Sequence, residues 1–340
     1  MAKKKSKKSE KKGLVKKAQA AKDFAKEKLA KKKPAQKELP AQELATKEPA
    51  KTDLAKKAPA QKEIEPYEKR YADFFDRPFG VDEYDNGKKR FCRLPAHVIV
   101  GTVSAIAKVC WRYEVHNRHS LEVLADRGGV VVMSNHTSYL DVVFMYLAIY
   151  PRYWPRFVAR DTLFEANEAL AWIFAHIGAF PVKRDTADRT AVKRAARMLK
   201  NGEIVGIMPE GSRRGKGSVA PRIHGGAALM ARMGKAPIMP MAVINVDKIK
   251  KKGERVRFPK VTVEFGNPVL LSDFDFLPKD ERLDACVWYA LRECFALFQG
   301  KAPEDVDMTA LFPEDKDFTK EFAEHPIPRL TSEQVAELLK

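Results

Sequence analysis

Cysteine is scarce in this chain, and none of the four cysteines belongs to a Cys-x-x-Cys pair. They are spread along the sequence at Cys92, Cys110, Cys286 and Cys294. Disulfide frameworks and cysteine-based zinc sites require paired or clustered cysteines. We therefore expect reduced, mostly buried thiols, and neither a disulfide scaffold nor a metal centre.

Long hydrophobic runs are also absent from the sequence. A membrane-spanning helix needs roughly 20 apolar residues in a row, and no such uncharged run occurs. The basic N-terminus is not followed by an apolar segment, so we expect no secretory signal. The longest apolar candidate, residues 94–111, contains His97 and Lys108 and is flanked by Arg93 and Arg112. This pattern fits either a helix lying in a membrane interface with basic ends or an ordinary packed helix.

Positive charge is concentrated at the N-terminal end. The chain has a net charge of +18, and residues 1–65 hold 21 lysines against 9 acidic residues. The remainder of this segment is mostly alanine, glutamine and proline in loose repeats, which cannot form a hydrophobic core. We predict that residues 1–65 are a disordered, basic, low-complexity tail. Such a tail could bind an anionic membrane surface or a nucleic acid, in both cases by salt-dependent attraction.

The rest of the chain has the composition of one globular domain with two flanking segments. Residues 66–118 are predicted to form an aromatic extension and an amphipathic, membrane-facing helix at 95–116. Residues 119–300 are predicted to form the main domain. Residues 301–340 are acidic and interrupted by proline, and we expect a C-terminal tail with a short helix at about 331–339.

Strand and helix signals alternate through the main domain. Short apolar runs predict strands at 130–133, 156–160, 179–182, 204–208, 238–243 and 261–265. Helical patterns occur between them, at 139–150, 165–176, 186–201, 226–233 and 280–299. This alternation predicts an α/β fold with a mixed, largely parallel central sheet flanked by helices.

The segment 135–141, Asn-His-Thr-Ser-Tyr-Leu-Asp, directly follows the first apolar run. Histidine can accept a proton near neutral pH, and a carboxylate bonded to its other ring nitrogen fixes the tautomer. Five positions lie about 140° apart around a helix, so His136 and Asp141 cannot meet if both are mid-helix. They can meet if His136 lies in a loop and a helix begins near Ser138 as its N-cap. The pair is then either a catalytic base with its orienting carboxylate or a structural hydrogen bond.

Two further polar clusters follow predicted strands. Lys183-Arg184 follows the strand at 179–182, and Glu210-Gly211-Ser212-Arg213 follows the strand at 204–208. Guanidinium groups bind phosphate through paired hydrogen bonds, and backbone N–H groups of a turn can assist. Each cluster taken alone also fits a solvated basic loop. Because sites in open α/β sheets gather beyond the carboxyl ends of strands, we expect both clusters to share one edge with His136.

Together and in this order, the clusters resemble the motifs of the phospholipid/glycerol acyltransferase family, which includes the 1-acylglycerol-3-phosphate acyltransferases. The likeness extends over roughly residues 95–270. The residues that carry it are Asn135, His136 and Asp141; Gly178, Phe180 and Arg184; Met208-Pro209-Glu210-Gly211-Ser212-Arg213; and the apolar, proline-containing stretch 236–243.

The resemblance implies a glycerolipid acyltransferase-like fold, with residues 119–300 as the catalytic domain. It implies that His136 is a general base acting on a glycerol hydroxyl and that Asp141 orients the imidazole. The implied substrate-binding residues are Asn135, Arg184, Glu210, Gly211, Ser212 and Arg213. No cofactor or metal is implied, and the acyl donor is expected to be an acyl-CoA or acyl-carrier protein thioester. A covalent acyl-enzyme is not required.

The chain departs from the family pattern at two places. Ser212 replaces the usual threonine and keeps the hydroxyl. Residues 223–226 read Ile-His-Gly-Gly, where the family often has Phe-Lys-x-Gly. The missing lysine leaves open which acyl carrier or headgroup is recognised at that position.

The implied reaction is acylation of lysophosphatidate to phosphatidate in phospholipid biosynthesis. The motifs also fit glycerol-3-phosphate or another lysolipid as the acceptor. A lipid acceptor implies a peripheral location on the cytoplasmic face of the cell membrane, with the basic tail near the anionic surface. A protein whose main role is membrane or nucleic-acid tethering by this tail is the alternative, although the tail has no base-reading module. A catalytically inactive relative is disfavoured, because His136, Asp141, Glu210 and Arg213 are all present.

Overall fold

The computed structural model describes residues 66–78, 93–183, 188–211, 220–250 and 253–339, and within the second range side chains are described from residue 97 onwards. All of these residues belong to the unit Lys62–Lys340. The predicted basic tail, residues 1–65, lies outside the described residues, as does Cys92.

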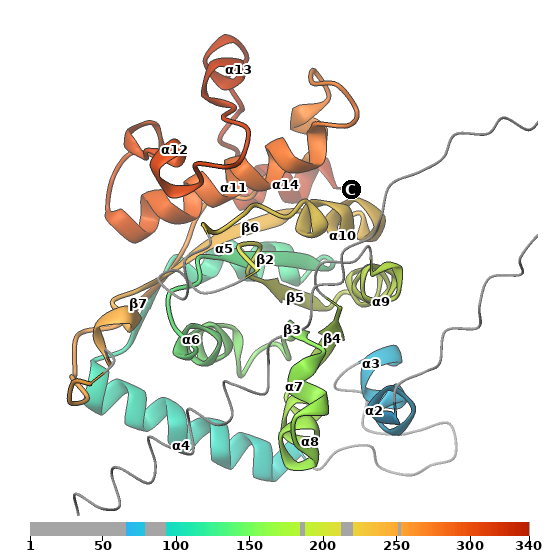
Figure 1. Cartoon of the computed structure of the whole chain (residues 1–340), viewed down its shortest axis with the longest axis vertical. Coiled ribbons are helices and arrows are strands. Elements are labelled where there is room, and N and C mark those ends of the chain that lie inside the picture. The colour runs from blue at the N-terminus through green and yellow to red at the C-terminus, as the bar shows by residue number, and fades with distance from the viewer. Residues whose placement is uncertain (1–65, 79–92, 184–187, 212–219, 251–252, 340) are drawn as a thin grey trace, which may run out of the picture. The chain divides into compact units, whose positions relative to one another are not determined.

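Seven strands form one sheet in the described part of the chain, in the order β1-β7-β6-β2-β5-β3-β4 (Figure 1). The strands are β1 (Glu114–His116), β2 (Val130–Ser134), β3 (Arg156–Arg160), β4 (Ala179–Val182), β5 (Ile204–Ile207), β6 (Ile238–Ile244) and β7 (Thr262–Phe265). Only the β6–β7 pair is antiparallel among these strands, and every other neighbouring pair is parallel. The predicted α/β fold with a mixed, largely parallel sheet is confirmed.

Helices cover both faces of this sheet. They are α2 (Pro66–Arg70), α3 (Ala72–Asp76), α4 (Arg93–Trp111), α5 (Arg118–Ala125), α6 (Leu140–Ile149), α7 (Thr162–Glu165), α8 (Glu168–His176), α9 (Arg189–Lys200), α10 (Gly226–Gly234), α11 (Arg282–Gln299), α12 (Met308–Leu311), α13 (Thr319–Glu324) and α14 (Ser332–Leu338). Figure 1 shows α10 and α11 on one side of the sheet, and α6 and α4 on the other. The sheet therefore lies between two helical layers (Figure 1).

The central strand β2 is buried over its whole length. Val131 pairs with Val205 of β5 on one side and with Ile238 of β6 on the other. Strands that are buried on both faces have continuous apolar sequences rather than alternating ones, which is why the run 130–133 has no polar residue. This burial fixes the point at which the chain leaves the sheet, immediately before Asn135.

Two predicted helices have different boundaries in the structure. The helix predicted at 95–116 ends at Trp111, because Arg112 has a left-handed backbone with φ of 44°. Residues 114–116 instead form strand β1, which pairs with β7, so the helical prediction for these residues was wrong. The helix predicted at 165–176 is present as α8 and begins three residues later, because Glu165 ends the separate helix α7 and Asn167 caps α8 by accepting the amide of Ala169 at 2.7 Å.

The acidic C-terminal segment packs on the main domain. Phe318 and Phe322 are buried, and the Phe322 ring lies 5.5 Å from the ring of Trp288 on α11. The predicted final helix is present as α14, which packs on α5, and Arg127 donates a hydrogen bond to the carbonyl of Ala336 at 2.6 Å. The C-terminal segment therefore adds buried hydrophobic contacts to the main domain, on α11 and on α5.

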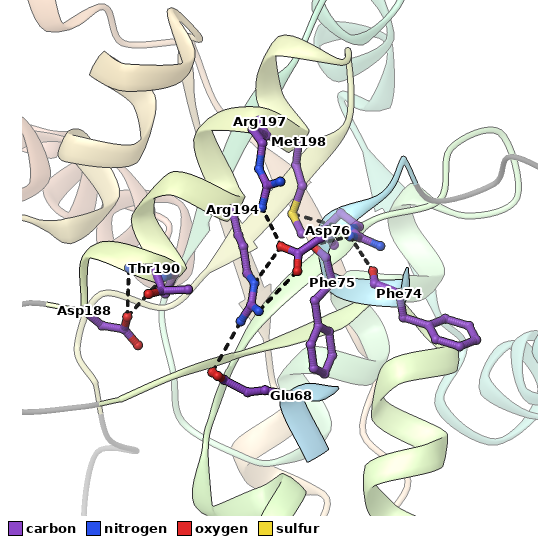
Figure 2. Close-up of polar contacts among 11 residues, drawn as sticks. Glu68, Phe74, Phe75, Asp76, Asp188, Thr190, Arg194, Arg197 and Met198 are labelled. Atoms are coloured by element: carbon purple, nitrogen blue, oxygen red, sulfur yellow. Dashed lines mark hydrogen bonds and ion pairs between the residues drawn. The ribbon is translucent and has the colours of Figure 1, made fainter. Parts of the chain in front are cut away.

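The helices α2 and α3 are held on α9 by a network of ion pairs (Figure 2). Asp76 accepts hydrogen bonds from Arg194 Nε at 2.9 Å and from Arg197 Nη2 at 2.5 Å. Arg194 is buried, also pairs with Glu68 at 3.5 Å, and lies over the Phe75 ring. Residues 66–78 of the predicted extension therefore pack on the main domain.

A second buried arginine joins this extension to the sheet. Arg156 in β3 is fully buried and donates to the carbonyl of Phe74 at 2.8 Å. Its Nε lies 3.1 Å from a carboxylate oxygen of Glu203. A buried guanidinium needs several partners to offset its desolvation, and here the extension supplies one of them.

We expect Asp76→Ala to lower the free energy of unfolding by about 1–3 kcal/mol, because it removes charge-assisted hydrogen bonds from the buried Arg194. Asp73→Ala is the matched control, since Asp73 on the same helix pairs with Arg77 at the surface. Exposed pairs of that kind contribute only about 0.2–1 kcal/mol. Urea denaturation of both variants measures the difference, and equal losses would show that the network does not hold the extension.

The Asp76 contribution should also depend on pH. Burial raises the pKa of Asp76, but hydrogen bonds and charge attraction from Arg194 and Arg197 outweigh it and hold the pKa below its usual value. The stabilisation is therefore complete above the ordinary aspartate pKa of about 3.9 and is lost as the pH falls through the depressed value. The difference between wild type and Asp76→Ala should accordingly shrink in acid.

Candidate active site

The turn between β2 and α6 holds the first group of site residues. β2 ends at Ser134 and α6 begins at Leu140, so His136 lies in the connecting loop and Asp141 lies in the first helical turn. This is the arrangement that the spacing predicted. The N-cap position is Tyr139 rather than Ser138, although the Ser138 hydroxyl oxygen accepts the amide of Leu140 at 3.3 Å.

His136 and Asp141 are in direct contact. His136 Nδ1 lies 3.1 Å from Asp141 Oδ2, and Asp141 is fully buried. The same oxygen accepts the amides of Thr137 and Ser138, each at 2.6 Å, and the Thr137 hydroxyl donates to the other oxygen at 3.3 Å. Because Asp141 is surrounded by donors, it favours Nδ1–H on the imidazole, which leaves Nε2 as the proton-accepting nitrogen.

The His136 ring is mostly buried but reaches the surface. Its side chain is 12% exposed, whereas that of Asp141 is 0% exposed. A ring that is fixed on one side by a buried carboxylate and open on another can exchange a proton with a bound molecule. This geometry suits a general base held by an orienting carboxylate.

Glu210 joins the second polar cluster to this turn. It follows β5, the neighbour of β2, and its Oε1 accepts the backbone N–H of His136 at 2.8 Å. Glu210 is 1% exposed. The sequence implied Glu210 only as a substrate-binding residue and did not indicate that it fixes the His136 backbone.

Asn135 connects β2 to β6. Its side-chain oxygen accepts the amide of Val243 at 3.1 Å, and its side-chain nitrogen lies 3.5 Å from the Val243 carbonyl. Asn135 is fully buried. These contacts fix the end of β2 next to His136, so Asn135 supports the site by joining β2 to β6.

Gly211 forms the turn after Glu210 and has a left-handed backbone with φ of 64°. A β-carbon at this position would lie 3.0 Å from Nε2 of His224, so both the backbone and the space favour glycine. His224 stands at the position where the family pattern often has lysine. The structure therefore places this departure beside the Glu210 turn.

Three predicted substrate-binding residues, Arg184, Ser212 and Arg213, lie outside the described residues. Hydrogen bonds fix the described residues on either side of the segment that contains Arg184. Lys183 follows β4, and its amide donates to Asp188 Oδ2 at 2.9 Å. Asp188 Oδ1 also accepts the amides of Thr190 and Ala191, so one carboxylate ties the end of β4 to the first turn of α9.

The described residues include no group of three or more histidine, cysteine or acidic side chains that could hold a metal ion. Cys110, Cys286 and Cys294, the cysteines of the described residues, are free thiols. Cys294 is buried below the site and donates to the Met133 carbonyl at 3.2 Å, and burial raises the pKa of this thiol. It is therefore neutral at physiological pH and is not a nucleophile.

The residues of the candidate site lie in the part of the chain that is similar to known proteins. The family model described as Acyltransferase matches residues 112–244, which span β1 to β6 and include the site turns. The 1-acyl-sn-glycerol-3-phosphate acyltransferase of Bacillus subtilis is 35% identical over 199 residues, which cover 58% of this chain and 89% of that protein. The protein of the same description from Streptococcus pneumoniae is 33% identical over 144 residues, covering 42% of this chain and 51% of its own.

Among solved structures, the 1-acyl-sn-glycerophosphate (LPA) acyltransferase PlsC from Thermotoga maritima aligns with a TM-score of 0.43 and 20% sequence identity. The alignment covers 61% of this chain and 83% of that chain.

Proposed function

The chain belongs to the family of 1-acyl-sn-glycerol-3-phosphate acyltransferases, and we propose that it acylates lysophosphatidate to give phosphatidate. It is an acyltransferase, and phosphatidate is a precursor in phospholipid synthesis. The observation that carries the proposal is the contact of His136 with the buried Asp141 at 3.1 Å, on a turn that Glu210 fixes by a hydrogen bond. The acyl donor is proposed to be the thioester of coenzyme A or of acyl-carrier protein.

The proposed reaction uses His136 first as a base and then as an acid. Nε2 takes the proton of the acceptor hydroxyl. At the same time the hydroxyl oxygen attacks the carbonyl carbon of the thioester, forming a C–O bond and a tetrahedral intermediate. The intermediate then expels the thiolate as the C–S bond breaks, and the proton on Nε2 passes to sulfur. Asp141 stabilises the transient imidazolium through its contact with Nδ1.

The acceptor phosphate is proposed to bind Arg184 and Arg213 near the Glu210–Gly211 turn. In the sequence, Arg184 comes after β4 and Arg213 comes after β5. These strands run parallel to β2, so they end at the same edge of the sheet as the strand that precedes His136. Arginine suits this task because its planar guanidinium pairs with phosphate through two hydrogen bonds. A phosphate held at this edge would bring the glycerol hydroxyl towards Nε2.

Arg213→Ala is expected to raise KM for lysophosphatidate by about tenfold to a hundredfold, because a charged hydrogen bond contributes about 1.5–3 kcal/mol. The kcat should change less, since the base remains in place. Steady-state kinetics with a thiol-release assay measure both constants. Arg232→Ala on α10 is the matched control, and a KM unchanged by Arg213→Ala would remove Arg213 from the acceptor site.

The same assay tests the acceptor. Lysophosphatidate, glycerol-3-phosphate and lysophosphatidylcholine are compared at equal concentrations with one acyl thioester, and lysophosphatidate is expected to give the highest kcat/KM. Faster turnover of glycerol-3-phosphate would assign the chain to the alternative acceptor. No thiol release with any of the three would reject the proposed function.

A lipid acceptor brings the enzyme to a membrane, and we place it peripherally on the cytoplasmic face. Among the described residues, no helix has both the length and the apolar character needed to cross a bilayer. Helix α4 nevertheless exposes a row of apolar side chains, with Val109 81% exposed. The exposed members are Val98, Ile99, Val103, Ile106 and Val109. Such a face suits shallow insertion parallel to the surface.

Deleting residues 1–60 is expected to weaken binding to anionic vesicles at low salt and to leave turnover of a soluble acceptor unchanged. Each lysine near an anionic leaflet contributes up to about 1 kcal/mol, and this contribution falls with ionic strength. Vesicle flotation at low and high salt measures the difference between the full chain and the truncated one. Equal binding by both would exclude a tethering role for the tail.

A further inference from the structure

The loop 253–260 lies at the C-terminal end of α4 and combines charged residues with exposed apolar ones. It reads Gly-Glu-Arg-Val-Arg-Phe-Pro-Lys. Val256 is 48% exposed and Phe258 is 54% exposed, so neither side chain contributes to the core. The proposed reaction makes no use of this loop, which we call the Phe258 loop.

The Phe258 loop is fixed to the end of α4. Trp111 Nε1 donates to the carbonyl of Arg257 at 3.1 Å, and Arg112 Nη2 donates to the carbonyl of Phe258 at 3.1 Å. The Trp111 and Phe258 rings lie 5.8 Å apart, and the Val261 amide donates to the Trp111 carbonyl at 2.9 Å. The loop is therefore held at the C-terminal end of α4, the end near which the exposed apolar row finishes at Val109.

The charge around these apolar side chains is positive. Cations are contributed by Lys108, Arg112, Arg255, Arg257 and Lys260, and the carboxylates in the same two segments are Glu114 and Glu254. Glu254 pairs with Arg257 at 2.5 Å, and Glu114 pairs with Lys260 at 2.7 Å. The two segments keep an excess of positive charge after these pairs are formed.

We propose that the Phe258 loop is a second membrane contact, which places Val256 and Phe258 among the acyl chains of an anionic leaflet and its arginines among the headgroups. Exposed apolar side chains suit the acyl-chain layer of such a membrane, and the cations beside them suit its anionic headgroups. This inference rests on the proposed lipid acceptor, and it adds a contact that α4 alone does not provide. A helix lying in an interface can roll about its axis, whereas a rigid loop at its end fixes the rotation.

The orientation has a consequence for the site. Tyr113, two residues after the end of α4, packs its ring 5.3 Å from that of Phe144 on α6, the helix that begins beside His136. Fixing the rotation of α4 on the membrane therefore fixes the direction in which the His136 edge faces the leaflet. An acceptor that remains in the membrane needs such a fixed orientation to reach Nε2.

The test uses the full chain carrying Val256→Ser and Phe258→Ser together. Flotation with vesicles of equal parts phosphatidylglycerol and phosphatidylcholine should show about tenfold weaker binding, because two inserted apolar side chains are lost. Phe276→Ser is the matched control. Phe276 is also exposed, but its ring packs 4.7 Å from His325 in the C-terminal segment, so its binding should equal that of wild type.

A second measurement does not depend on weakened binding. Phe258→Trp should gain fluorescence quenching by brominated lipid relative to wild type, and Phe276→Trp should gain none. Wild-type affinity in the double serine variant, or no gain of quenching at residue 258, would overturn the proposal. A change of oligomeric state with unchanged vesicle affinity would also overturn it, because it would assign the loop to a protein partner.

The assay separates this inference from the proposed function. Turnover of a short-chain, monomeric lysophosphatidate without vesicles should be the same in wild type and in the double serine variant. If wild type fails to acylate this acceptor, the proposed function fails, while flotation and quenching still decide whether the loop binds membranes.

Discussion

His136→Ala is expected to reduce kcat for acyl transfer by about 10²- to 10⁴-fold, the usual contribution of a positioned general base. The loss follows from the geometry, since Asp141 engages Nδ1 at 3.1 Å and leaves Nε2 for the acceptor hydroxyl. The KM for lysophosphatidate should change little, because the arginines proposed to bind its phosphate remain. Thiol release under saturating donor measures kcat directly.

The fold should survive this substitution. Asp141 is buried, but after loss of the imidazole it still accepts the amides of Thr137 and Ser138 at 2.6 Å each. The backbone N–H of residue 136, which donates to Glu210, is also retained. The free energy of unfolding should therefore fall by only about 1 kcal/mol, the value of one hydrogen bond.

His119→Ala is the matched control for loss of a histidine. His119 lies on α5 with its side chain 78% exposed and pairs with Glu333 at 3.6 Å. It should retain the wild-type kcat and a similar thermal midpoint. If purified His136→Ala turns over at the rate of His119→Ala, the proposed base is wrong.

The central strands could be predicted because strands buried on both faces consist of consecutive apolar residues, which are visible in the sequence. β2 and β5 are buried on both sides, so their residues form uninterrupted apolar runs, and predicted and observed bounds differ by one residue. The meeting of His136 with Asp141 was also a local inference, since five positions allow contact only across a loop-to-helix junction. Both results depend on neighbours in sequence.

Strand β1 could not be predicted in this way. Residues 114–116 are largely exposed and continue the helical pattern of α4, and their strand conformation comes from pairing with β7, where Glu114 lies opposite Thr262. Hydrogen bonds to a strand so distant in sequence leave no periodicity in the chain itself. Short edge strands are decided by such partners more than by their own propensity.

The role of Glu210 was missed for a related reason. Its bond to the His136 backbone joins the turns that follow β5 and β2, and it exists because these two strands are adjacent in the sheet. The sequence predicted one shared edge for the polar clusters but did not give the order of strands along it. The phosphate-binding role of Arg184 and Arg213 stays a prediction, because both lie outside the described residues.

Asp141→Asn is expected to lower kcat by about 10²- to 10⁴-fold while keeping the shape of the side chain. The amides of Thr137 and Ser138 both donate to the Asp141 oxygen that also contacts His136 Nδ1. In asparagine these donors keep the carbonyl oxygen at the position of this carboxylate oxygen, so it still accepts from Nδ1 and the imidazole tautomer is kept. The loss of turnover then follows from the missing negative charge, because a neutral amide stabilises the transient imidazolium less than a carboxylate does.

The Asp141→Asn variant also distinguishes a catalytic role of the carboxylate charge from simple destabilisation. Asp307→Asn is the matched control, because Asp307 likewise accepts an amide at a helix start, that of Ala310 at 2.8 Å, but lies in the C-terminal segment. Both variants should unfold at similar urea concentrations, and only Asp141→Asn should lose turnover. Since Asp141 acts through the charge with which it stabilises the His136 imidazolium, Asp141→Asn combined with His136→Ala should be hardly slower than His136→Ala alone. Losses that instead multiply in the double variant would show that Asp141 acts independently of His136.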